Sequence, residues 1–104
     1  MAWILLLLAG LFEIVMALSL KLSNGFGNLW WSLSFLGTAV LSFGLLSYAL
    51  KSLDVGTAYA VWTGVGAAGT AILGMVALGD TVSAARIVSI ALILAGVIGL
   101  RTLT

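Results

Sequence analysis

WILLLLAGLFEIVMALSL, residues 3–20 of the chain, contains a single charged side chain, that of Glu13. A helix needs about 20 mostly apolar residues to cross the hydrocarbon core of a bilayer, and this stretch with its flanks meets that length. Three further apolar runs follow it along the chain. We therefore predict membrane-spanning helices at approximately residues 3–21, 29–50, 55–78 and 84–102.

The predicted fold class is an all-α integral membrane protein, with residues 1–104 forming one domain of four transmembrane helices. The connections are short and leave no room for a soluble domain. The first run has no Lys or Arg before it and carries Glu13 midway, which argues against a cleaved signal peptide. The runs are continuous and rich in Leu and Ala, whereas barrel strands alternate apolar and polar residues.

Composition excludes several function classes. Charged residues make up 7% of the sequence, against about a quarter in a typical soluble domain. The chain has no Cys and no His, which excludes disulfides, thiolate or imidazole metal sites and Ser/His/Asp triads. The net charge is +1 and no basic patch is present. We expect no enzymatic activity, no cofactor, no metal and no nucleic-acid partner.

The positive charges that normally set membrane orientation are evenly divided. With four spans, Lys51 and Arg101 lie on one side of the membrane, and Lys21 and Arg86 lie on the other. Orientation follows an excess of Lys and Arg on the cytoplasmic side, and neither side has that excess. One interpretation is a weak bias from the N-terminal amine. The hypothesis we favour is insertion in both orientations, which gives an antiparallel, dual-topology homodimer.

The fourth span offers a surface for that pairing. Ala91, Ala95 and Gly99 recur every four residues and share one helix face. Small residues at this spacing let two helix backbones approach closely in lipid. We predict that they form the dimer interface; contact with another helix of the same subunit is the alternative.

A glycine-rich string in the third span, GVGAAG (residues 64–69), matches the dinucleotide fingerprint GxGxxG. The fingerprint requires a preceding strand and a following helix, and this string lies within an apolar span. We interpret it as small residues that allow close helix packing.

Glu13 is the only ionisable residue in the middle of a predicted span. A carboxylate at that depth is unfavourable by several kcal/mol and marks a functional site. The alternative is a structural carboxylate neutralised by a buried cation, but every Lys and Arg lies near a span end. Gly10, Met16 and Ala17 fall on the same helix face as Glu13, and the two small residues leave space beside the carboxylate.

Residues of the second and third spans are predicted to complete this site. The proton- and substrate-binding residues are Glu13, Ser42, Tyr59 and Trp62, and the further pocket-lining residues are Gly10, Met16, Ala17, Thr38, Thr63 and Gly66. The hydroxyls have an alternative role, because Ser and Thr in membrane helices often bond to their own backbone. For Trp62, plain packing is the alternative.

A carboxylate, hydroxyls and aromatic faces together suit an organic cation. The carboxylate supplies the charge, and ring faces add cation–π attraction of about 0.5–2 kcal/mol. Protons and the cation compete for the same oxygens. If the site opens to one side at a time, this competition gives proton-coupled exchange.

Three motifs occur in a fixed order: Glu13, then K-x-S-x-G-F at residues 21–26, then GTAYAVWTGVG at residues 56–66. This order resembles the small multidrug resistance transporters, over essentially the full chain. The resemblance implies an antiparallel homodimer in the bacterial inner membrane that exchanges cytoplasmic cations for periplasmic protons. It implies that Glu13 of both subunits forms the shared site, that Tyr59 and Trp62 line it, and that Ser42 hydrogen-bonds within it.

Within that family, the chain is similar to the guanidinium exporters. Ala9-Gly10 before Glu13, Trp62-Thr63-Gly64 and Gly99-Leu100-Arg101 carry this resemblance. Met16 stands where that branch has Trp, and Asp54 stands where it has Pro. We therefore expect export of guanidinium or small guanidinyl cations. The alternative is broader export of quaternary ammonium and alkylated cations, which the flexible Met16 side chain would favour.

Two other classes compete with a transporter. A dual-topology ion channel fits the size and the charge balance, but a mid-membrane carboxylate is a poor feature for an anion channel. Rotor-ring subunits also use a buried carboxylate, but on two-span hairpins without these aromatic residues.

Overall fold

The described residues, 1–103, form four α-helices in a computed structural model of the chain: α1 (Ala2–Leu22), α2 (Leu29–Ala49), α3 (Val55–Ala77) and α4 (Ala84–Leu103). At 1.5 Å per residue each helix is about 30 Å long or slightly longer, which matches the hydrocarbon thickness of a bilayer. All four are long and apolar enough to cross a membrane. The predicted fold class of four membrane-spanning helices is confirmed.

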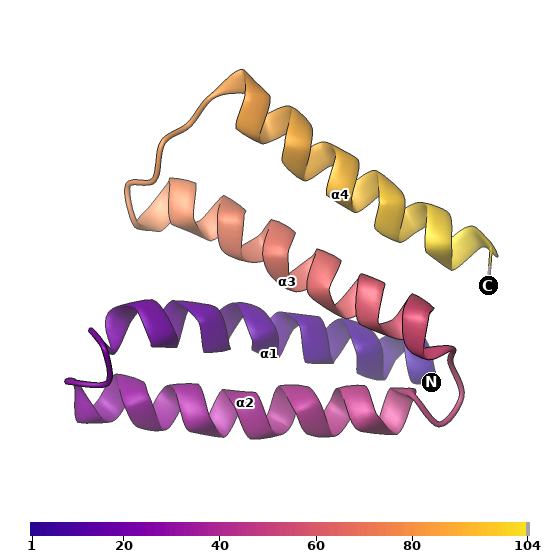
Figure 1. The fold of residues 1–104 in the computed structure, drawn as a ribbon, viewed down its shortest axis with the longest axis horizontal. Coiled ribbons are helices and arrows are strands. Elements are labelled where there is room, and N and C mark those ends of the chain that lie inside the picture. The colour runs from indigo at the N-terminus through magenta and orange to yellow at the C-terminus, as the bar shows by residue number, and fades with distance from the viewer. Residues whose placement is uncertain (104) are drawn as a thin grey trace.

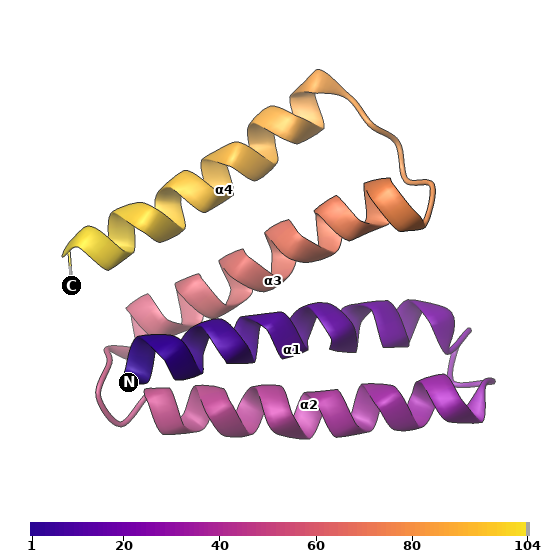
Figure 2. The ribbon, with the colours of Figure 1, turned by 180° about the vertical axis from the view of Figure 1, so that it is seen from behind.

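The helices run alternately up and down in a flat arrangement. Figures 1 and 2 show α1 beside α2, α3 lying across α1, and α4 on the outer side of α3. The N-terminus, the α2–α3 loop and the C-terminal end of α4 lie at one end of the bundle, and the other two loops lie at the opposite end (Figure 1). Each loop therefore falls on the membrane side that its position in the chain requires.

Local side chains fix the turn between α1 and α2. Ser23 is fully buried, and its hydroxyl donates to the Leu20 carbonyl at 2.7 Å while accepting the Phe26 N–H at 3.2 Å. Gly25 has a φ of 69°, a left-handed conformation that glycine adopts without strain. Asn28 then caps α2, because its side-chain oxygen accepts the Trp31 N–H at 3.1 Å.

The buried core lies where α1, α2 and α3 meet. Its members are apolar and come from all three helices: Leu6, Ala9, Leu46, Ala49, Ala58, Val61 and Trp62. By contrast, Ile90 is the one residue of α4 that is buried within the described chain. The backbone of α4 packs against α3 alone.

Glycines allow the close helix packing that the GVGAAG string suggested. A methyl group at Gly69 would overlap Ile14 of α1, and one at Gly64 would overlap Val97 of α4. The string therefore gives α3 close contacts with a helix on either side, as small residues do in membrane bundles.

A polar contact also ties α1 to α2. Ser19 is fully buried, and its hydroxyl lies 2.7 Å from that of Ser34. In lipid such a hydrogen bond contributes modestly to the stability of the bundle, because the hydroxyls of separated helices find other hydrogen-bond partners.

We predict that this pair stabilises the bundle by about 0.6 kcal/mol of coupling. A double-mutant cycle with Ser19→Ala and Ser34→Ala in mixed micelles, monitored by reversible unfolding, measures it. Ser89→Ala is the matched control, because the Ser89 hydroxyl donates to Ala85 in its own helix. A coupling near zero would contradict the prediction.

Candidate functional site

The Glu13 carboxylate lies midway along α1 and faces α3. A methyl group at Gly66 would overlap its carboxyl group, so α3 offers bare backbone at the point of contact. The Glu13 Oε1 atom is buried and has no hydrogen-bond partner within residues 1–103. A buried polar atom without a partner is unfavourable by about 1–3 kcal/mol, and more when it is charged. A proton or a cation at this oxygen would supply the missing partner.

Ser42 joins three helices through hydrogen bonds. It is fully buried on α2. Its hydroxyl donates to the Ala9 carbonyl of α1 at 2.7 Å and accepts the Trp62 indole N–H of α3 at 2.9 Å. The Ser42 hydroxyl is thus a fixed polar group one helical turn from Glu13, since Ala9 precedes Glu13 by four residues.

Two further aromatic rings pack on Trp62, the donor of this hydrogen bond. Trp62 is 4% exposed, and its ring centroid lies 5.3 Å from that of Tyr59 and 5.1 Å from that of Phe43. Tyr59 is 52% exposed, so one face of the group is open. These spacings are typical of favourable aromatic pairs. Trp62 is consequently held both by packing against the rings of Tyr59 and Phe43 and by the hydrogen bond of its indole N–H.

The two threonines predicted to line the site bond to their own helices. The Thr38 hydroxyl donates to the Ser34 carbonyl at 2.7 Å, and the Thr63 hydroxyl donates to the Tyr59 carbonyl at 2.8 Å. This is the backbone-bonding role that the sequence left open. Their hydroxyl protons are not directed at Glu13.

The three predicted residues on the Glu13 face of α1 differ in burial. Gly10 is buried, and a methyl group there would press on Val65 of α3. Met16 and Ala17 are partly exposed. Gly10 therefore serves the α1–α3 contact, while the other two lie about one helical turn from Glu13 and keep accessible surface.

Within one subunit the predicted residues form two groups rather than a closed box. One group is the Glu13 carboxylate against Gly66, and the other is Ser42 with Trp62 and Tyr59. Gly66 follows Trp62 by four residues, so the groups are about 6 Å apart along α3. Nothing in the described chain bridges them by a hydrogen bond to Oε1.

Sequence reasoning missed two residues that hold Ser42 and Trp62 in place. Phe43 packs on Trp62, and the Ala9 carbonyl holds the Ser42 hydroxyl. Phe43 carries no polar atom and lies next to Ser42 in the chain, so only its proximity to Ser42 could have pointed to it.

Within residues 1–103, the predicted interface residues of α4 are only partly covered by their own subunit. Ala91 and Ala95 are exposed, and a methyl group at Gly99 would meet no atom of the described chain within 4 Å. Among residues 1–103, no group of His, Cys, Asp and Glu side chains could hold a metal ion.

Residues 1–93 match the family model for the Small Multidrug Resistance protein. A guanidinium exporter of Yersinia pseudotuberculosis is 58% identical over 101 residues, which is 97% of each chain. A guanidinium exporter of Salmonella typhimurium is 52% identical over 101 residues, covering 97% of this chain and 96% of the relative. A guanidinium exporter of Citrobacter freundii is 50% identical over 104 residues, covering 100% and 99%.

We predict that Gly66→Ala lowers the affinity for guanidinium at least tenfold, because the added methyl group displaces the Glu13 carboxyl group. Isothermal titration of the purified protein measures this affinity. Gly37→Ala is the matched control, since a methyl group there meets open space within the described chain. Unchanged binding by a folded Gly66→Ala protein would show that the carboxylate does not need this space.

Proposed function

Because the chain belongs to the Small Multidrug Resistance family, we propose that it exports guanidinium or small guanidinyl cations in exchange for protons. The family match and the guanidinium exporters among the relatives support this activity. The chain is a multi-pass protein of the inner membrane, with four spanning helices and relatives from Gram-negative bacteria. In this proposal it moves an ion and converts no substrate chemically.

One observation carries the proposal: the Glu13 carboxylate is buried against Gly66 with an oxygen that has no partner in residues 1–103. A proton or a cation satisfies that oxygen, and the two exclude each other. When the site faces the cytoplasm the cation displaces the proton, and when it faces the other side a proton displaces the cation. Strict alternation of access then couples the two fluxes.

Ser42, Tyr59 and Trp62 have supporting roles in this proposal. The ring faces of Tyr59 and Trp62 attract a cation that leaves the carboxylate, at about 0.5–2 kcal/mol. Ser42 orients Trp62 through the indole N–H. Gly10 and Gly66 allow the close α1–α3 packing that places Glu13 against α3, and Ala17 adds little side-chain bulk one turn from the carboxylate.

The active form in this proposal is an antiparallel homodimer that pairs through Ala91, Ala95 and Gly99. This face of α4 is open in the subunit. The balanced Lys and Arg count permits both orientations. Each copy then brings its own Glu13 to the shared site.

Broader export of alkylated cations remains the second candidate, favoured by Met16. This side chain is partly exposed beside the carboxylate, and it adapts to irregular apolar shapes. The names of the relatives favour guanidinium.

We predict that Glu13→Gln abolishes proton-driven guanidinium uptake into vesicles while the dimer stays assembled. A neutral amide carries neither a titratable proton nor a net charge. Glu13→Asp should retain part of the transport. Asp54→Asn is the matched control, because this carboxylate is exposed before α3 and makes no side-chain capping bond. Substantial proton-driven uptake by Glu13→Gln would place the coupling site elsewhere.

We also predict that two lysines added to the Lys51–Asp54 loop fix one orientation and abolish transport by that chain alone. Co-expression with a chain biased the opposite way should restore it. Guanidinium resistance of cells, together with a topology reporter on the C-terminus, measures both effects. Full activity of the singly biased chain would disprove the inverted dimer.

A further inference from the structure

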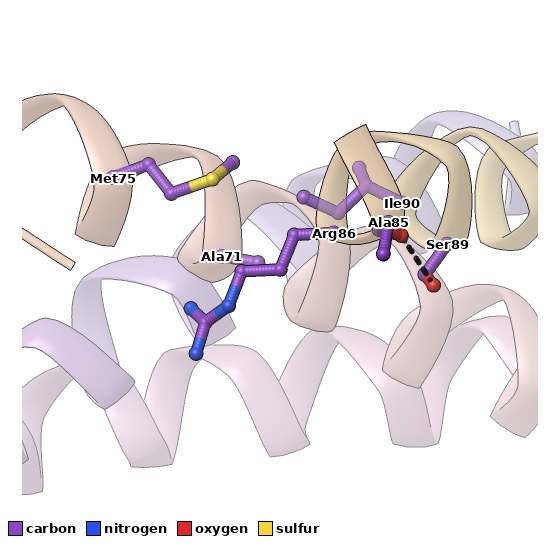
Figure 3. A pocket seen from close by; sticks show the side chains of 6 residues that line it. All are labelled: Ala71, Met75, Ala85, Arg86, Ser89 and Ile90. Atoms are coloured by element: carbon purple, nitrogen blue, oxygen red, sulfur yellow. Dashed lines mark hydrogen bonds between the residues drawn. The ribbon is translucent and has the colours of Figure 1, made fainter. Parts of the chain in front are cut away.

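A cavity of about 280 Å³ opens between the C-terminal half of α3 and the first turns of α4. Its lining is mostly apolar and includes one charged residue: Ala71, Met75, Ala85, Arg86, Ser89 and Ile90. Figure 3 shows the Arg86 side chain extending from α4 toward Ala71 on α3. The cavity thus combines apolar walls with a guanidinium group.

Within residues 1–103, Arg86 has no ionic partner. None of the Asp and Glu side chains in residues 1–103 forms an ion pair with it. The nearest carboxylate in sequence, Asp80, folds back on α3 instead, since a methyl group at Gly74 would overlap it. The Ser89 hydroxyl donates to the Ala85 carbonyl at 2.8 Å and leaves its lone pairs free to accept. The cavity therefore has an uncompensated positive charge.

The position of Arg86 sets the depth of this charge. It is the third residue of α4, so it lies within the first turn and close to the membrane surface. Arginine at such a position extends its charged head to the level of the lipid headgroups. Basic pockets between membrane helices bind anionic headgroups.

We propose that this cavity binds an anionic phospholipid, with the phosphate on Arg86 and part of one acyl chain between Ala71 and Ile90. Guanidinium pairs with phosphate through parallel hydrogen bonds. The transported cation has the wrong charge for this cavity, so the site is distinct from the Glu13 site. The lipid site does not depend on the proposed transport activity.

The cavity stays accessible in the proposed dimer. Nine residues separate Arg86 from Ala95, which places them about 180° apart around α4. Pairing through the face of Ala95 therefore leaves the Arg86 side, which lines the cavity with α3, outside that interface.

A second cavity, of about 240 Å³, provides an internal control. It is lined by residues of α1, α3 and α4: Trp3, Leu7, Val61, Val97, Ile98, Arg101 and Thr102. Its arginine is already engaged, because the Arg101 guanidinium lies 4.8 Å from the centroid of the Trp3 ring. Arg101 is therefore a cation of similar depth whose guanidinium already lies against an aromatic ring.

The test compares two relocated charges. Arg86→Gln with Thr81→Arg moves the first cation into the adjoining loop, and Arg101→Gln with Ser52→Arg moves the second. Both double variants keep the net charge and the Lys/Arg balance across the membrane. Native mass spectrometry of the purified full chain, titrated with phosphatidylglycerol or phosphatidylcholine of identical chains, measures lipid binding.

We expect wild type to prefer phosphatidylglycerol about fivefold, which is the contribution of one arginine near anionic lipid. The Arg86 relocation should remove this preference, and the Arg101 relocation should keep it. Ala71→Leu should weaken phosphatidylglycerol binding without a change in charge, because the added side chain fills the cavity. Inorganic phosphate at equal concentration should not compete.

Three results would overturn the proposal. The first is an unchanged preference after the Arg86 relocation, and the second is an equal loss after both relocations, which would indicate general charge attraction. The third is full competition by inorganic phosphate, which would indicate a free-anion site. Guanidinium uptake by the double variant Arg86→Gln with Thr81→Arg reports separately on whether the Glu13 site still works.

Discussion

A carboxylate in the middle of a membrane-spanning helix is the constraint on which this structure depends. Glu13 needs space on the facing helix, and Gly66 provides it. The packing on either side follows from this contact, because Gly10 meets Val65 on one side and Ile14 meets Gly69 on the other. A single bulky residue at one of these glycines would separate α1 from α3. The Glu13 carboxyl group therefore lies in the same α1–α3 contact that packs these two helices together.

The subunit consists of two parts that differ in how much of their surface is buried. Helices α1, α2 and α3 form the core and are tied by Ser42 and by the Ser19–Ser34 contact. Helix α4 attaches to α3, where Gly64 accepts Val97, and its opposite face has no neighbour in residues 1–103. A helix with so little buried surface contributes little to the stability of one subunit. Its exposed small residues and its two arginines suit contacts with a second copy and with lipid.

The sequence predicted the helical membrane fold and the family, because long apolar runs and motif order do not depend on side-chain geometry. Three hydroxyl residues of α2 show where such reasoning ends. Ser34, Thr38 and Ser42 are equally spaced, yet they bond to another serine, to their own helix and to the carbonyl of Ala9. Which role each takes depends on the local distance between helices and on the rotamer. The spacing of residues along the sequence predicts neither the distance between helices nor the rotamer.

The hydrogen bonds near Glu13 also indicate why one subunit offers too few hydrogen-bond acceptors for guanidinium, the proposed substrate. The Trp62 indole N–H is already donated to Ser42, and the Ser42 hydroxyl proton is already donated to Ala9. These side chains are thus held in place, and the one acceptor they still offer is the second lone pair of the Ser42 hydroxyl. Guanidinium has more N–H donors than a single carboxylate can accept, and buried donors without partners are unfavourable. A second Glu13, brought by an inverted copy, would supply the missing acceptors and the second exchangeable proton.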